Sequence, residues 1–143
     1  MKKELIVLVS RTFSKDICKK NPNTLFIFGD NQLHEGEGGT ACIRRERNAI
    51  GISTKHLPAN DKKAFYTDDE YEDNVRVFEE DIDRIETYAE KIEATSLAFP
   101  YYGIGTGLAQ LGLKAPKTFF YMCTRLYDLY KYNNLEGILE LKN

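Results

Sequence analysis

The sequence predicts an α/β domain in which strands and helices alternate along 143 residues. Three observations support this prediction. Short runs of aliphatic and aromatic residues, typical of strands buried in a sheet, recur along the chain, and a long amphipathic helix separates two of them. Glycine-rich segments directly follow two of the runs. Because ligands of layered α/β domains bind at the carboxyl ends of strands, these two segments indicate where a site would lie.

The expected elements follow each other in a regular order. Apolar runs predict strands at residues 5–9, 24–28, 49–54, 95–99 and 137–141. Ser14 is a suitable N-cap for a short helix that ends before Pro22, and residues 40–49 form a second expected helix. Residues 75–92 show the clearest helical periodicity, and Pro116 fits the first turn of a last helix. The polar residues 58–73 are expected to form a surface loop, or a lid over a ligand.

The composition bounds the class of protein. A chain of this length buries one hydrophobic core, and no linker, repeat or low-complexity stretch divides it, so we expect a single domain over residues 1–143. The formal net charge of −2 argues against a general nucleic-acid binder. A basic group at Arg44, Arg45 and Arg47 is the exception, and we interpret it as a solvated helix face.

The cysteines and the apolar segments indicate the cellular compartment in which the protein is expected. Cys18, Cys42 and Cys123 lie far apart and form no metal-binding or disulfide pattern, which favours reduced thiols in the cytoplasm. The apolar start is interrupted by Glu4, so we interpret it as a strand and not as a signal peptide. No apolar segment reaches membrane-spanning length. We therefore expect a cytoplasmic protein without a metal, a cofactor or membrane contact.

The segment FPYYGIGTG, residues 99–107, is the most informative stretch. Glycines alternate at positions 103, 105 and 107, where they allow close approach to the backbone and φ values above zero. Successive N–H groups of such a loop converge on an anion such as a phosphate. Thr106 offers a hydroxyl to the same phosphate, and Tyr101 or Tyr102 offers a ring that stacks on a base or a ribose.

A second glycine cluster, residues 29–41, follows the apolar run TLFIF. Asn31 suits ribose hydroxyls or a positioned water, and Asp30 suits ribose hydroxyls or an adenine amine. An alternative is that both residues only cap the turn, because both types bond their own backbone. The remaining candidates for ligand contact in this cluster are Gly36, Gly38, Gly39 and Thr40.

Three side chains are candidates for acid–base or nucleophilic chemistry. Lys55, at the end of AIGISTK, is the best candidate for a reactive amine, with a solvated lysine as the alternative. His34 and His56 have no orienting carboxylate beside them in the sequence, so we expect neither to be catalytic.

These residues resemble those of macrodomains, the family of ADP-ribose-binding modules. In that family an apolar strand ends at an asparagine, a loop of the GGGVAGAI kind follows, and a later strand ends in a P-x-x-G-x-G-x-G phosphate loop. The segments NQLHEGEGGTACI and FPYYGIGTGLAQLG are similar to these two elements, and the resemblance covers roughly Leu25 to Leu126. It implies a three-layer α/β/α fold with a mixed central sheet, in a compact, divergent member of the sort often met in phage and bacterial genomes.

The resemblance also implies roles for individual residues. Asn31 would meet the distal ribose, Gly38 and Gly39 would approach the diphosphate, and residues 103–107, with Ile104 among them, would wrap the phosphates. Lys55 is similar to a strand-end lysine of macrodomains that remove ADP-ribose from acidic side chains. The aspartate that assists this lysine is absent, since Ala109 and Gln110 stand there.

We therefore expect a protein that binds ADP-ribose or a related nucleotide, cyclic ones included. Its use would be recognition of ADP-ribosylated protein or nucleic acid, or sequestration of a free nucleotide, to which homo-oligomerisation would contribute. The alternative is an ADP-ribosyl glycohydrolase that uses Lys55, Asn31 or both. A third hypothesis is a nucleic-acid interaction domain that uses the basic group.

Overall fold

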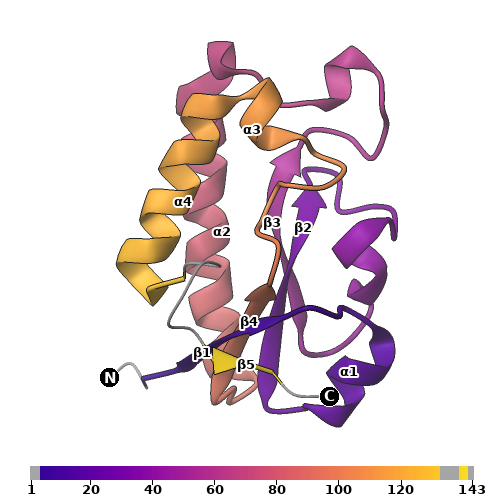
Figure 1. Cartoon of the computed structure of the whole chain (residues 1–143), viewed down its shortest axis with the longest axis vertical. Coiled ribbons are helices and arrows are strands. Elements are labelled where there is room, and N and C mark those ends of the chain that lie inside the picture. Colours follow the sequence, from indigo (N-terminus) through magenta and orange to yellow (C-terminus); the bar gives the residue numbers. More distant parts are fainter. Residues whose placement is uncertain (1–3, 133–138, 142–143) are drawn as a thin grey trace.

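The computed structural model describes residues 4–132 and 139–141. Its strands are β1 (Ile6–Ser10), β2 (Thr24–Asn31), β3 (Ala49–Lys55), β4 (Ser96–Pro100) and β5 (Leu139–Glu140) (Figure 1). Its α-helices are α1 (Lys15–Lys20), α2 (Tyr71–Lys91), α3 (Leu111–Lys114) and α4 (Pro116–Tyr130). Short 3₁₀ helices lie at η1 (Gly39–Ile43), η2 (Lys62–Ala64) and η3 (Asp68–Glu70). The predicted α/β class is confirmed.

The strands form one sheet in the order β3-β2-β4-β1-β5, and all pairings between the described strands are parallel. The expectation of a mixed sheet is therefore wrong for these strands. Parallel neighbours require crossover connections, and the segments that carry α1, η1 and α2 provide them between successive strands. Because the paired strands run in one direction, their carboxyl ends lie at the same edge of the sheet.

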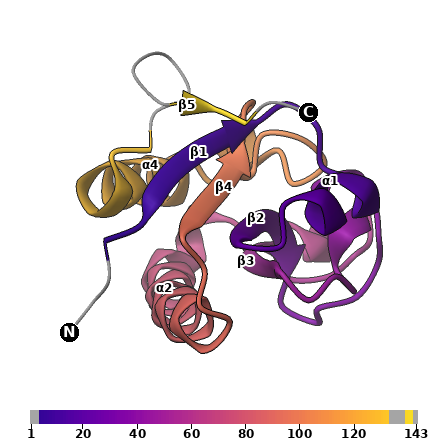
Figure 2. The same cartoon turned by 90° about the horizontal axis from the view of Figure 1, so that it is seen from below.

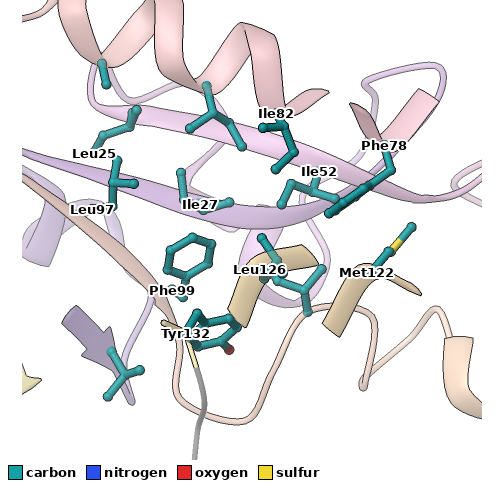
Figure 3. Packing of buried hydrophobic residues seen from close by; sticks show 14 of the residues in the cluster. Leu25, Ile27, Ile52, Phe78, Ile82, Leu97, Phe99, Met122, Leu126 and Tyr132 are labelled. Carbon is teal, nitrogen blue, oxygen red and sulfur yellow. The ribbon is translucent and has the colours of Figure 1, made fainter. Parts of the chain in front are cut away.

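Helices cover both faces of the sheet. Figure 2 shows α2 and α4 on one side and α1 with the neighbouring η1 segment on the other. Residues of β2 alternate between these faces: Leu25 and Ile27 belong to the core under α2 and α4, and Phe26 and Phe28 belong to the core under α1 and η1. This double burial explains why β2 reads as a continuous apolar run. Figure 3 shows the larger core, in which Phe78 and Ile82 of α2 lie near Ile52 of β3.

Side chains of helix α2 also form hydrogen bonds with backbone groups at the outer edge of β3. The buried carboxylate of Asp81 accepts a hydrogen bond from the Ser53 amide at 2.8 Å. Arg84 donates to the Gly51 carbonyl at 3.3 Å and to Asp81 at 2.9 Å. Burial raises the pKa of Asp81, and the bonds from Ser53 and Arg84 act against that rise. Two backbone groups at this edge of the sheet, the Ser53 amide and the Gly51 carbonyl, are therefore paired with side chains of α2.

Two expected segments differ from the prediction. The helix expected at residues 40–49 is only the 3₁₀ helix η1. The buried side-chain amide of Asn48 donates to the carbonyls of Cys18, Asn21 and Thr24, each at 2.9 Å, and this anchor fixes the chain just before β3. Of the last expected strand, residues 139 and 140 form β5, while 137 and 138 lie outside the described residues.

The expected lid at residues 58–73 is anchored in the fold. Ala64, Phe65 and Tyr66 are buried, and Phe65 forms an antiparallel bridge with Lys55. The phenol of Tyr66 accepts a hydrogen bond from Gln32 at 3.0 Å. The middle of this segment therefore belongs to the core, and only its flanks are at the surface. None of the helices that the structure describes could span a bilayer.

We expect Phe78→Ala to lower the free energy of unfolding by about 3–5 kcal/mol, because it removes a fully buried ring that packs edge-on against Tyr121 of α4. Urea denaturation followed by circular dichroism measures the change. Phe120→Ala is the matched control, since the Phe120 side chain is 74% exposed and its loss should change stability by less than about 0.5 kcal/mol. Equal losses in the two variants would contradict the described packing of α2 on α4.

Candidate functional site

Two glycine-rich loops meet at the carboxyl edge of the sheet. The first glycine loop, residues 32–40, follows β2, and the second glycine loop, residues 101–110, follows β4, the neighbour of β2 in the sheet. In Figure 1 the second loop lies beside the ends of β2 and β3. A Cβ placed on Gly38 would lie 3.1 Å from Cδ1 of Leu108, and one on Gly39 would lie 3.8 Å from the same atom. The two loops are therefore in contact through the Leu108 side chain.

The second glycine loop contains a run of backbone amides that lack a protein acceptor among the described residues. Its ends are tied by bonds from the Gly103 amide to the Pro100 carbonyl and from the Leu111 amide to the Gly105 carbonyl. Between these ends, none of the described residues accepts a hydrogen bond from the amides of residues 104–109. Gly103 and Gly105 have φ values of 101° and 78°, and a Cβ on Gly105 would lie 2.9 Å from Leu111. This backbone requires glycine and has the alternation from which anion-binding nests are built.

The first glycine loop contains a similar run of backbone amides without a protein acceptor in the described part of the chain. Among the described residues, no acceptor takes the amides of residues 35–40, and Gly36 and Gly39 have φ values of 88° and 59°. The hydroxyl of Thr40 accepts a hydrogen bond from the Gly29 amide at 3.0 Å. Thr40 therefore joins the end of this loop to the carboxyl end of strand β2, and its hydroxyl oxygen already has a partner inside the protein.

Asp30 is the centre of a buried ion-pair cluster at the end of β2. One carboxylate oxygen lies 2.6 Å from Nη2 of Arg44 and the other lies 2.8 Å from Nδ1 of His34. Burial acts to raise the pKa of Asp30, but hydrogen bonds from Arg44 and His34 outweigh it and hold the pKa below its ordinary value. A Cβ on Gly51 would lie 2.6 Å from the Asp30 Cβ, so the glycine in β3 provides the space for this carboxylate. Both oxygens of Asp30 have protein partners.

The side chain of Asn31 shapes the first glycine loop. Its amide nitrogen donates to the Glu35 carbonyl at 2.7 Å, and its oxygen accepts from the Leu33 amide at 3.1 Å. Arg44 adds bonds to the carbonyls of Gly36 and Glu35 at 2.8 and 3.1 Å. Asp30 and Asn31 thus make the turn-capping bonds that the sequence left open as an alternative to ligand contact.

Lys55 lies beneath the segment that follows β3. Its ammonium group donates to the Ala59 carbonyl at 2.6 Å and lies 4.7 Å from the centre of the Phe65 ring, on which Lys114 also rests at 4.9 Å. Burial lowers the pKa of Lys55, and attraction to Asp61 acts in the opposite direction. The amine is therefore easier to deprotonate than an exposed lysine, but its nitrogen is engaged by the protein.

The side chains of the second glycine loop are partly engaged. The guanidinium of Arg11 lies 3.7 Å from the centre of the Tyr101 ring, which leaves Tyr102, 65% exposed, as the tyrosine whose ring is more open to solvent. The hydroxyl of Thr106 donates within the loop, to the carbonyls of Tyr102 and Gly103 at 2.9 and 3.2 Å. Buried Ile104 anchors the loop, and a Cβ on Gly107 would meet nothing within 4 Å.

The sequence interpretation missed two members of the Asp30 cluster. Arg44 is not part of a solvated face, because it pairs with a buried carboxylate. His34 has an orienting carboxylate four residues earlier, and this spacing of Asp30 and His34 was the available signal. His56 also has a carboxylate partner, Glu70, at 2.5 Å. No group of three metal-ligating side chains occurs within residues 4–132 and 139–141.

The fold and these loops define a parallel α/β domain in which, among the described residues, two runs of loop amides at the carboxyl edge of the sheet have no protein acceptor. The model of a family of unknown function, DUF7831, matches residues 8–125, and the chain belongs to that family. Neither a curated protein nor a solved structure matches the chain.

We expect Asp30→Asn to lower the free energy of unfolding by about 3 kcal/mol near pH 7, because it leaves Arg44 without its buried partner. The folded-state pKa of Asp30 is depressed, so its contribution is present above the unfolded value near ~3.9 and is lost as the pH falls through the folded value. The difference between wild type and variant should therefore shrink below about pH 4. Urea denaturation across this pH range measures it.

Asp69→Asn is the control for this experiment, since Asp69 is exposed and should give no pH-dependent difference. A constant difference between wild type and Asp30→Asn at every pH would show that the charge of Asp30 does not stabilise the fold.

Proposed function

We propose that this protein binds ADP-ribose or a related nucleotide, cyclic ones included, through the backbone of its two glycine loops. The observation that carries the proposal is the pair of amide runs, residues 35–40 and 104–109, on loops that touch at the carboxyl edge of the sheet. Amides without a protein acceptor need water or an anion. A diphosphate supplies several charged oxygens close together, which suits two neighbouring runs of donors better than a single carboxylate does.

The resemblance to macrodomains supports the same ligand. It rests on the glycines that would contact the diphosphate, Gly38 and Gly39 in the first loop and residues 103–107 in the second. The positive φ values of Gly39, Gly103 and Gly105 agree with such a role, since they turn neighbouring amides toward one side. The parallel pairing of the described strands differs from the expected mixed sheet, so the family relation is proposed from the loops alone.

The use of such a site would be recognition of ADP-ribosylated protein or nucleic acid, or sequestration of a free nucleotide in the cytoplasm. Both uses need a pocket that holds its ligand without a cofactor. The exposed ring of Tyr102 at the second loop is available to stack on a base or a ribose of the bound nucleotide. A homo-oligomer would increase the number of sites that one target meets.

We expect ADP-ribose at a hundredfold excess over its Kd to stabilise the protein by about 2.7 kcal/mol. Gly105→Ala should weaken this binding at least about tenfold, because the positive φ and the contact with Leu111 leave no room for a methyl group in this backbone. Thermal shift and titration calorimetry measure both effects, with NAD and cyclic dinucleotides as further ligands.

Gly107→Ala is the matched comparison, since it adds the same methyl group in the same loop where no atom lies within 4 Å, and the amide is kept. It should bind like wild type. If Gly105→Ala binds every ligand as tightly as wild type, the phosphates do not lie on the second loop. If no nucleotide of the panel stabilises wild type, the proposal fails.

The depressed pKa of Lys55 favours a second candidate, an ADP-ribosyl glycohydrolase in which Lys55 or Asn31 acts on the ribose. However, both side chains are bonded to loop backbone: Lys55 to Ala59, and Asn31 to Glu35 and Leu33. These bonds indicate that the two residues hold the loops in place and do not act on a ligand. We therefore expect the bond between the ribose and the modified side chain of an ADP-ribosylated protein to stay intact, and borohydride to trap no adduct on Lys55, as mass spectrometry would show. Release of ADP-ribose that Lys55→Arg abolishes would favour the hydrolase.

A further inference from the structure

The two histidines of the chain differ in one decisive respect. His56 uses both ring nitrogens, since Nδ1 lies 3.3 Å from Gln32 and Nε2 lies 2.5 Å from Glu70. His34 uses only Nδ1, on the buried carboxylate of Asp30 at 2.8 Å. No described residue forms a hydrogen bond with Nε2 of His34, and the side chain is about half exposed. Only His34 therefore combines an oriented ring with a nitrogen that is free to exchange a proton with a ligand or a water.

Several independent contacts hold His34 in this position. Its φ is 57°, an uncommon value for a residue other than glycine, and its amide donates to the Asn31 carbonyl at 3.0 Å. The Asn31 side chain and Arg44 fix the residues on either side, through their bonds to Leu33, Glu35 and Gly36. Left-handed backbone that is over-determined by its surroundings is a mark of functional sites.

The ionised carboxylate of Asp30 sets the tautomer of His34. Arg44 and the Asn31 amide keep Asp30 ionised, so Asp30 accepts a hydrogen bond from the N–H group at Nδ1 of the imidazole. The lone pair of the neutral ring is then on Nε2, the nitrogen that faces away from the cluster. His34 immediately precedes the free amides of residues 35–40, and a phosphate held by those amides would be the electrophile nearest to it along the chain.

We propose that His34, oriented by Asp30, is a general base that activates water for hydrolysis of a phosphoanhydride or phosphodiester bond in the bound nucleotide. The inference rests on the proposed function for its natural ligand. Water gives a proton to Nε2 of His34 while its oxygen bonds to phosphorus, and the bond from phosphorus to the bridging oxygen breaks. The leaving group, a phosphate from an anhydride or an alkoxide or phenolate from a diester, takes that electron pair. His34 then returns the proton to solvent or product. Free amides of the first loop stabilise the charge that develops on the phosphoryl oxygens.

The test follows ADP-ribose by phosphorus NMR in water enriched in oxygen-18. The wild-type protein should convert it to AMP and ribose 5-phosphate, with one labelled oxygen in a product phosphate. His34→Asn should slow the reaction at least about 100-fold and leave the ADP-ribose affinity within about twofold of wild type. Asparagine tolerates the positive φ of this position and has no ring nitrogen to act as base, so a loss of rate without a loss of binding separates catalysis from loop support. His56→Asn is the control and should keep the wild-type rate.

A second probe, bis(p-nitrophenyl) phosphate, separates this inference from the proposed function. If ADP-ribose binds and neither probe is hydrolysed, the general base is refuted and the nucleotide site stands. If ADP-ribose neither binds nor reacts, while His34→Asn abolishes hydrolysis of the second probe, the base stands and the nucleotide proposal fails. Equal rates in wild type and His34→Asn overturn the inference for either probe.

Discussion

The buried contact between Asp30 and Arg44 links the sheet to the first glycine loop. The carboxylate lies at the carboxyl end of the interior strand β2, where Gly51 of the neighbouring edge strand β3 leaves space for it. Arg44 neutralises this charge and, with the same guanidinium, binds the carbonyls of Glu35 and Gly36. Because an unpaired carboxylate at this depth would be costly, the loop geometry and the ionised state of Asp30 depend on each other. The orientation of His34 follows from its bond to the same carboxylate.

The second glycine loop is positioned by packing instead of charge. Buried Ile104 and Leu111 fix it to the core, and the close fit between Gly105 and Leu111 sets its backbone. A Cβ on Gly105 would also lie 3.5 Å from Thr54 of β3. The loop that follows β4 therefore extends past β2 to β3, a strand that does not pair with β4 in the sheet. One loop is thus held electrostatically and the other by apolar contacts, and they meet at Leu108. Acid that protonates Asp30 should therefore affect the first loop more than the second.

The sequence sufficed for the elements whose pattern is local. The apolar run of β2 and the periodicity of α2 were predicted because burial leaves a direct mark on residue type, and the two glycine loops stood out because positive φ requires glycine. The partners of Asp30 and Asn31 were missed, since a pairing such as Asp30 with Arg44 depends on how the chain returns after the loop. The end of the predicted helix before β3 was wrong for a similar reason: the anchor at Asn48 reaches carbonyls that lie far earlier in the chain.

The attachment of α2 along β3 has a consequence for how copies of this protein can meet. The Ser53 amide and the Gly51 carbonyl are already bonded to Asp81 and Arg84, so another strand could pair with these two groups only if α2 detached. Detachment would expose Phe78 and Ile82 to water and leave Asp81 without its amide partner. At these two positions the folded core itself therefore opposes extension of the sheet by another chain.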